Sequence, residues 1–153
     1  MKILFLILSL IPILVQSEDK IDWKNLNPAT VIKAIDQLEA SPIKAKEKGI
    51  LPIVLNYAEA SNKVKVTISS DLLPWLKEEK KVENADILLV AFVAGNMKGQ
   101  LTKSIKKDNS LDGLKFMIKT YSKLLNSKQI INIKKLDEWA KLKEADLKKL
   151  IKS

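Results

Sequence analysis

The chain has 153 residues, of which 46% are apolar and 29% are charged, and its 27 basic residues are all lysine. This length predicts one domain of ordinary size, and the apolar fraction is typical of a folded globule. Cysteine and histidine are both absent, which excludes disulfides, thiolate nucleophiles, iron–sulfur clusters, imidazole bases and histidine-ligated zinc. We therefore expect no cofactor.

Residues 1–17 have the pattern of a secretory signal peptide. Lys2 supplies the positive charge, and Ile3 to Val15 form an apolar stretch that only Ser9 and Pro12 interrupt. As a helix this stretch would span roughly 20 Å, less than the roughly 30 Å of a bilayer core. We predict cleavage after Ser17, export to the periplasm or the medium of a bacterium, and a single helical domain over residues 18–153 without a transmembrane span. An uncleaved membrane anchor is the alternative.

Proline, asparagine and glycine divide the rest of the chain into short helices. Asn27-Pro28 predicts a helix start, Ser41-Pro42 ends that helix and starts a short one, and Gly49 closes the second helix. A third helix is expected over residues 50–60. Apolar and polar residues alternate over residues 64–68, but a lone five-residue strand has nothing to pair with, so we predict an extended connector there.

Beyond the connector, Ser70 is expected to cap a helix that reaches Leu76 and holds Pro74 in its first turn. Asn84 is expected to cap a helix over about residues 85–107. Its eight consecutive apolar residues, 87–94, indicate burial on every side.

An amphipathic helix is expected over residues 111–126, and two short helices over residues 133–152 with a break near Lys143. The predicted fold is an all-α bundle of six or seven short helices around the buried central helix 85–107.

The central helix contains the least ordinary pattern in the sequence. Ala91, Gly95 and Gly99 are four residues apart and form a ridge of small residues, although glycine costs about 1 kcal/mol in a helix. Close packing against a neighbouring helix would compensate for this cost. The alternative is a binding notch at Gly95 and Gly99 in which Asn96 and Gln100 present their amides to a ligand or partner.

The positive charge is concentrated in residues 98–153, which carry 15 lysines against six acidic residues. Lys115, Lys119 and Lys123 stand on successive turns and predict a cationic face that binds an anionic surface. Phe116 points toward this lysine side, which indicates either a contact surface or a second neighbouring helix. The alternative explanation of the charge is compositional, since lysine without arginine is typical of an AT-rich genome.

Catalytic and metal-binding patterns are weak. Glu59, at the end of an apolar helix, is the one candidate general acid, and no second carboxylate can be named for it. No metal-ligand spacing occurs, and the absence of arginine disfavours nucleic acid as a partner.

The expected function is therefore a non-catalytic binding or structural role at the bacterial cell envelope. The expected partner is an anionic envelope component or another envelope protein. A small cell-wall glycan hydrolase that uses Glu59 as its general acid is the alternative.

Overall fold

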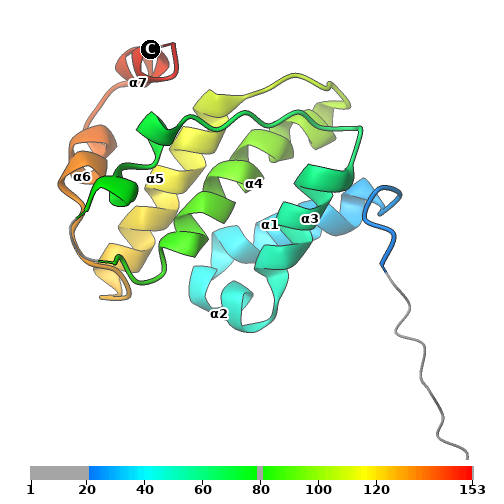
Figure 1. Ribbon diagram of the computed structural model, residues 1–153, viewed down its shortest axis with the longest axis horizontal. Coiled ribbons are helices and arrows are strands. Elements are labelled where there is room, and N and C mark those ends of the chain that lie inside the picture. The colour runs from blue at the N-terminus through cyan, green and yellow to red at the C-terminus, as the bar shows by residue number, and fades with distance from the viewer. Residues whose placement is uncertain (1–20, 79–80, 153) are drawn as a thin grey trace, which may run out of the picture.

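The computed structural model describes residues 21–78 and 81–152, and all regular secondary structure in these ranges is helical (Figure 1). The predicted all-α fold is thereby confirmed. The described residues contain seven α-helices and two 3-10 turns, which are, in chain order, α1 (Pro28–Ala40), α2 (Pro42–Glu47), α3 (Ile50–Ala60), η1 (Ser70–Leu72), η2 (Pro74–Lys77), α4 (Ala85–Lys103), α5 (Ser110–Asn126), α6 (Lys134–Ala140) and α7 (Glu144–Leu150). The predicted signal peptide, residues 1–17, lies outside the described residues.

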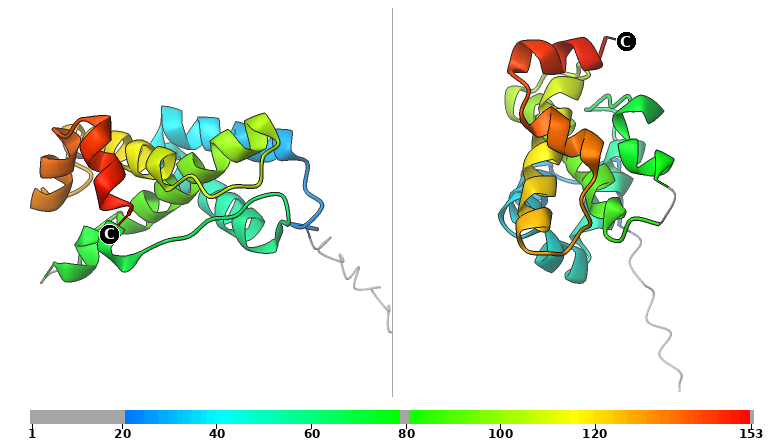
Figure 2. Two further views of the ribbon diagram at one scale, coloured as in Figure 1. Left: turned by 90° about the horizontal axis from the view of Figure 1, so that it is seen from above. Right: turned by 90° about the vertical axis from the view of Figure 1, so that its left-hand side faces the viewer.

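The main packing pair is α4 with α5, which run side by side through the middle of the molecule (Figure 1). Helices α1, α2 and α3 pack on α4, while α6 and α7 pack on α5. Seen from above, α4 runs between α1 and α5 on one side and α3 with the segment 61–69 on the other (Figure 2). This position explains why α4 is buried almost all round and why its apolar residues follow one another without a polar face.

Several helix boundaries form as the sequence predicts. The Asn27 side chain accepts a hydrogen bond from the backbone N–H of Ala29 at 2.9 Å, and Pro28 begins α1. Gly49 has a left-handed backbone, with φ of 69°, between α2 and α3. Helix α6 ends at Ala140 and α7 begins at Glu144, so the helical interruption expected near Lys143 is present. Residues 64–68 are extended and do not form a strand.

The helix expected from Ser70 to Leu76 is instead two short 3-10 turns. Leu73 lies between them with φ of −117° and ψ of 66°, outside the helical region. Its conformation has a local cause, because the ring of Pro74 disfavours a helical backbone in the preceding residue. The cap is also one residue earlier than predicted, since the Ser69 side chain accepts from the backbone N–H of Asp71.

The central helix differs from the prediction at both ends. Asn84 precedes it in a left-handed conformation, and its side chain donates to the Gln129 carbonyl instead of capping α4. Helix α4 ends at Lys103 and not near residue 107, because Ser104 is left-handed with φ of 53° and the Ile105 N–H closes the helix on the Gln100 carbonyl. Ile105, which the predicted helix 85–107 would have included, is 55% exposed.

Helices α4 and α5 touch backbone to backbone at two glycines. A Cβ on Gly95 would lie 2.4 Å from the Phe116 Cβ and 2.6 Å from the Asp112 carbonyl oxygen. A Cβ on Gly113 would lie 2.7 Å from the Phe92 carbonyl oxygen. The packing explanation of the small-residue ridge is therefore correct at Gly95. Gly113 is the counterpart of Gly95 on α5, and its role was not predicted from the sequence.

This contact predicts opposite outcomes for two similar substitutions. Gly95→Ala forces α4 and α5 apart and should lower the free energy of unfolding by about 1–3 kcal/mol, as overpacking does. Gly99→Ala places its Cβ 3.3 and 3.4 Å from the ends of the Asn109 and Asp112 side chains, so it should leave stability unchanged or raise it by up to about 1 kcal/mol. Urea denaturation followed by circular dichroism measures both. Equal stability of the two variants would contradict the close helix contact.

Candidate functional site

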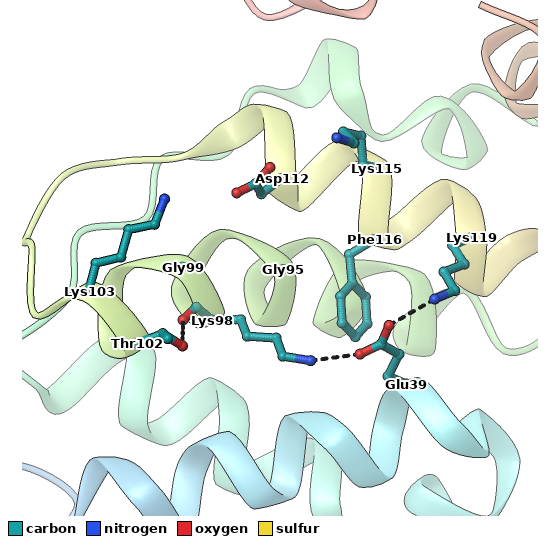
Figure 3. A pocket seen from close by; sticks show the side chains of 10 residues that line it. All are labelled: Glu39, Gly95, Lys98, Gly99, Thr102, Lys103, Asp112, Lys115, Phe116 and Lys119. Atoms are coloured by element: carbon teal, nitrogen blue, oxygen red, sulfur yellow. Dashed lines mark hydrogen bonds and ion pairs between the residues drawn. The ribbon is translucent and has the colours of Figure 1, made fainter. Parts of the chain in front are cut away.

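A cleft of about 480 Å³ opens beside α4, between α5 and the end of α1 (Figure 3). Gly95 and Gly99 of α4 line it without contributing side chains, and Phe116 projects from α5 toward α1. Lysines surround this surface, and they are Lys98, Lys103, Lys115 and Lys119. The remaining lining residues are Glu39, Thr102 and Asp112.

Glu39 on α1 is the central charged residue of the cleft. Its carboxylate pairs with Lys98 of α4 at 2.7 Å and with Lys119 of α5 at 2.9 Å. Hydrogen bonds from Lys98 and then Lys119 lower the pKa of Glu39 to about 2. Lys98 also pairs with Asp36 at 2.9 Å. One half-buried carboxylate therefore ties three helices together along one wall of the cleft.

The predicted cationic row on α5 is engaged within the chain. Lys119 pairs with Glu39, and Lys115 pairs with Glu144 of α7 at 3.0 Å. The Lys123 ammonium donates to the backbone carbonyl of Glu39. The spacing correctly places the three lysines on one side of α5, but their ammonium groups hold α1 and α7 against it and do not form an unpartnered face.

Lys103, at the end of α4, differs from the other lysines of the cleft. It is exposed, and no ion pair or hydrogen bond joins its ammonium group to the described residues. In Figure 3 its side chain extends from α4 toward the start of α5, at one end of the cleft. The Asp112 carboxylate across the cleft already accepts a hydrogen bond from the Asn109 side chain at 2.6 Å.

Phe116 is 9% exposed, with its Cβ against Gly95. Its position on the lysine side was interpreted either as a contact surface or as burial against a neighbouring helix. The low exposure agrees with burial, since α5 contacts α4 at this point. The remaining exposed part of Phe116 contributes to the lining of the cleft.

Asn96 and Gln100 do not belong to this cleft. Asn96 is fully buried. Its side-chain oxygen, Oδ1, accepts hydrogen bonds from the Gln100 side-chain amide and from the Asn109 backbone N–H, both at 2.8 Å. Gln100 is 3% exposed and binds both backbone polar groups of Lys65, at 2.8 and 3.0 Å. Neither amide is presented to this cleft, because the polar groups of both are hydrogen-bonded inside the protein.

These amides fasten two irregular segments to α4. The Asn96 amide donates to the Asp108 carboxylate at 3.1 Å, and the same carboxylate accepts from the Thr67 backbone N–H. Burial raises the pKa of Asp108, but hydrogen bonds from Ser110, Thr67 and Asn96 outweigh it and hold the pKa below its usual value. The segments 63–67 and 105–109 are thus held in place by an ionised, well-satisfied carboxylate.

Glu59, the candidate general acid, is exposed at the end of α3. It does not line the cleft between α1, α4 and α5, and it has no hydrogen bond or ion pair with the described residues. Its setting therefore lacks the apolar enclosure that raises the pKa of a catalytic carboxyl group.

Among residues 21–78 and 81–152, no group of three or more acidic side chains is placed to hold a metal ion. Within the same residues, no helix is both long and apolar enough for a membrane span.

No family model, curated protein or solved structure matches the chain. The residues of the cleft therefore carry no role assigned by similarity, and their chemistry must be judged from their geometry.

Sequence pattern indicated part of this cleft. The spacing of Gly95 and Gly99 identified a helix face without side chains, and Phe116 stood out on the lysine side of its helix. Glu39 and Lys98 were missed, because nothing local in the sequence shows that α1 lies opposite α4. One signal for an acidic patch was available in the sequence. It is the pair Asp36 and Glu39, which stand three residues apart near the end of a helix with an apolar stripe.

The low pKa of Glu39 predicts an acid-sensitive stability. A carboxyl whose pKa falls from 4.5 to about 2 on folding contributes stability that is complete above about pH 4.5 and is lost as the pH falls toward 2. Glu39→Gln should therefore be less stable than the parent at pH 7, and the difference should shrink between pH 4.5 and pH 2. Thermal melts across this range measure the effect.

Glu144→Gln is the matched control. Glu144 also has a pKa lowered to about 2, by Lys148 and then Lys115, but it is exposed and solvent screens its pairs. Its removal should change the pH dependence less. An equal or larger effect at Glu144 would contradict the role of Glu39.

Proposed function

We propose that this protein is an exported, non-catalytic binding protein of the bacterial envelope. Its cleft between α1, α4 and α5 would take a small ligand with one anionic group and an apolar body. The observation that carries the proposal is the composition of the cleft, where lysines surround a surface of two glycines and a phenylalanine.

The charge of the cleft favours an anion. Four lysines line it against the two carboxylates of Glu39 and Asp112, so the lining has a positive excess. Lys103 is the cation available to a ligand, while Lys98 and Lys119 share one carboxylate. A ligand carboxylate, sulfonate or phosphate near Lys103 would gain charge-assisted hydrogen bonds without breaking an internal pair.

The lining of the cleft favours a flat apolar body. Gly99 is only partly buried and leaves the α4 backbone open to close approach, and Phe116 offers the edge of an aromatic side chain. Binding sites of small molecules commonly combine an apolar lining with a few polar groups that fix orientation.

Location at the envelope rests on the sequence. The signal-like residues 1–17 support export, and the positive charge of residues 98–153 supports an anionic partner. The exposed position of Glu59 gives the hydrolase alternative no structural support.

An aromatic anion tests the cleft directly. Anilinonaphthalene sulfonate should bind the protein with increased fluorescence, and Gly99→Leu should weaken binding by about tenfold or more by occupying the cleft. Lys103→Gln should weaken binding several-fold, since a single charge interaction is worth on the order of 1 kcal/mol. The uncharged probe phenylnaphthylamine should respond to Gly99→Leu and not to Lys103→Gln.

Lys135→Gln is the matched control, because it removes the same charge from the start of α6, outside the cleft. It should bind the probe as the parent does. If Gly99→Leu keeps both the stability and the probe affinity of the parent, the ligand site does not lie in this cleft.

A further inference from the structure

A second surface lies where α4 ends, formed by two segments that are far apart in the chain. The connector 63–68 and the loop 104–109 run along the same edge of the molecule (Figure 1). Gln100 binds the backbone of Lys65, and Asp108 binds the backbone N–H of Thr67 at 2.6 Å. The two segments therefore form one fixed surface although neither is helical.

This surface is positively charged without compensation. The sequence has no acidic residue over 60–70 or over 87–107. The nearest carboxylate in the chain, that of Asp108, is occupied by its hydrogen bonds to Thr67, Asn96 and Ser110. The lysines of the surface are exposed and have no ion pair with the described residues, and they are Lys63, Lys65, Lys103, Lys106 and Lys107.

An isoleucine projects from the middle of these lysines. The left-handed Ser104 ends α4 and puts Ile105 in the loop, where 55% of its surface is exposed. Beside it lies a hollow of about 280 Å³ that is lined by Lys103, Ile105 and Lys107 together with Gly99, Gln100, Asp108 and Asn109. An exposed isoleucine next to a lysine-lined hollow combines an apolar anchor with a site for an anionic group.

We propose that this surface, the Ile105 face, binds the protein peripherally to a bilayer that contains anionic lipids. The ammonium groups of Lys103 and Lys107 would bind a headgroup phosphate in the hollow. Ile105 would enter the boundary between headgroups and acyl chains, as apolar residues flanked by lysines do at membrane interfaces. Each lysine near an anionic leaflet increases partition by about fivefold.

A lipid surface fits this face better than a soluble polyanion does, because the polyanion gives Ile105 nothing apolar to contact. A second exposed isoleucine, Ile131, also has lysines nearby. There the charge is mixed, since Asp137 and Glu138 follow Lys134 and Lys135. The Ile131 region is therefore a natural control for lysine and isoleucine content alone.

The proposal is tested with the exported protein and sedimenting vesicles. Vesicles of phosphatidylglycerol and phosphatidylcholine should bind it more tightly than vesicles of phosphatidylcholine alone. The double variant Lys106→Glu, Lys107→Glu should lose at least tenfold in partition, and this loss should shrink as salt reduces the Debye length from about 10 Å to about 3 Å. Ile105→Asp should lose several-fold at every salt concentration.

The matched controls are Ile131→Asp and the double variant Lys134→Glu, Lys135→Glu, which should partition nearly as the parent does. If the variants of the Ile105 face and the control variants lose vesicle binding equally, the proposal is overturned, because net charge alone then explains the binding. The proposal would also be overturned, in favour of a polymer partner, by a different pattern. In that pattern the lysine reversal weakens binding to isolated cell-wall polymer but not to vesicles, and Ile105→Asp changes neither.

The membrane proposal shares Gly99 and Lys103 with the cleft, so residues that the cleft lacks distinguish the two. Ile105, Lys106 and Lys107 do not line the cleft, so their variants should bind anilinonaphthalene sulfonate as the parent does.

Discussion

The close approach of α4 and α5 is the constraint on which the other features depend. At Gly95 and Gly113 each helix backbone takes the space that a Cβ would need on the other. Glycine destabilises a helix by exposing its backbone and increasing the entropy of the unfolded chain, and contacts of the whole helix pair compensate for this cost. One turn further along α4, Gly99 is only partly buried and lines the cleft, so the same ridge of small residues that packs against α5 also borders the surface on which a ligand could lie.

Burial of most of α4 has a second consequence. The polar side chains on its buried faces cannot reach solvent, so they must find partners inside the protein. Asn96 and Gln100 use theirs to bind the connector and the loop after α4, which have no helical hydrogen bonds of their own. The buried amides thus fix irregular backbone at the end of the molecule where an exposed isoleucine and uncompensated lysines are presented.

The features that sequence predicted are those with a local cause. The helix start at Asn27-Pro28 depends on backbone preferences of neighbouring residues, and the break near Lys143 was expected because a charged residue falls within an apolar stripe. The eight apolar residues 87–94 required a buried helix whatever their partners. Ser104 was missed because serine has no intrinsic preference for the left-handed conformation that ends α4. Glu39 was missed because its partners on α4 and α5 are 59 and 80 residues further along the chain. The internal partners of the lysine row on α5 could not be predicted, since spacing along one helix does not show which acids face it.

The structure separates two uses of lysine that composition alone cannot distinguish. On α5, Lys115 and Lys119 pair with carboxylates of other helices, and Lys148 pairs with Glu144 within α7, so the charge of these lysines is compensated by nearby acids. Lys106 and Lys107 have no such partner and stand beside an exposed isoleucine. An AT-rich genome would explain why the basic residues are lysine. It would not explain why acids accompany the lysines on the helices and are absent from two separate segments that the fold brings together. That segregation is a property of the folded chain, and it places a group of lysines without acidic partners at one edge of the protein.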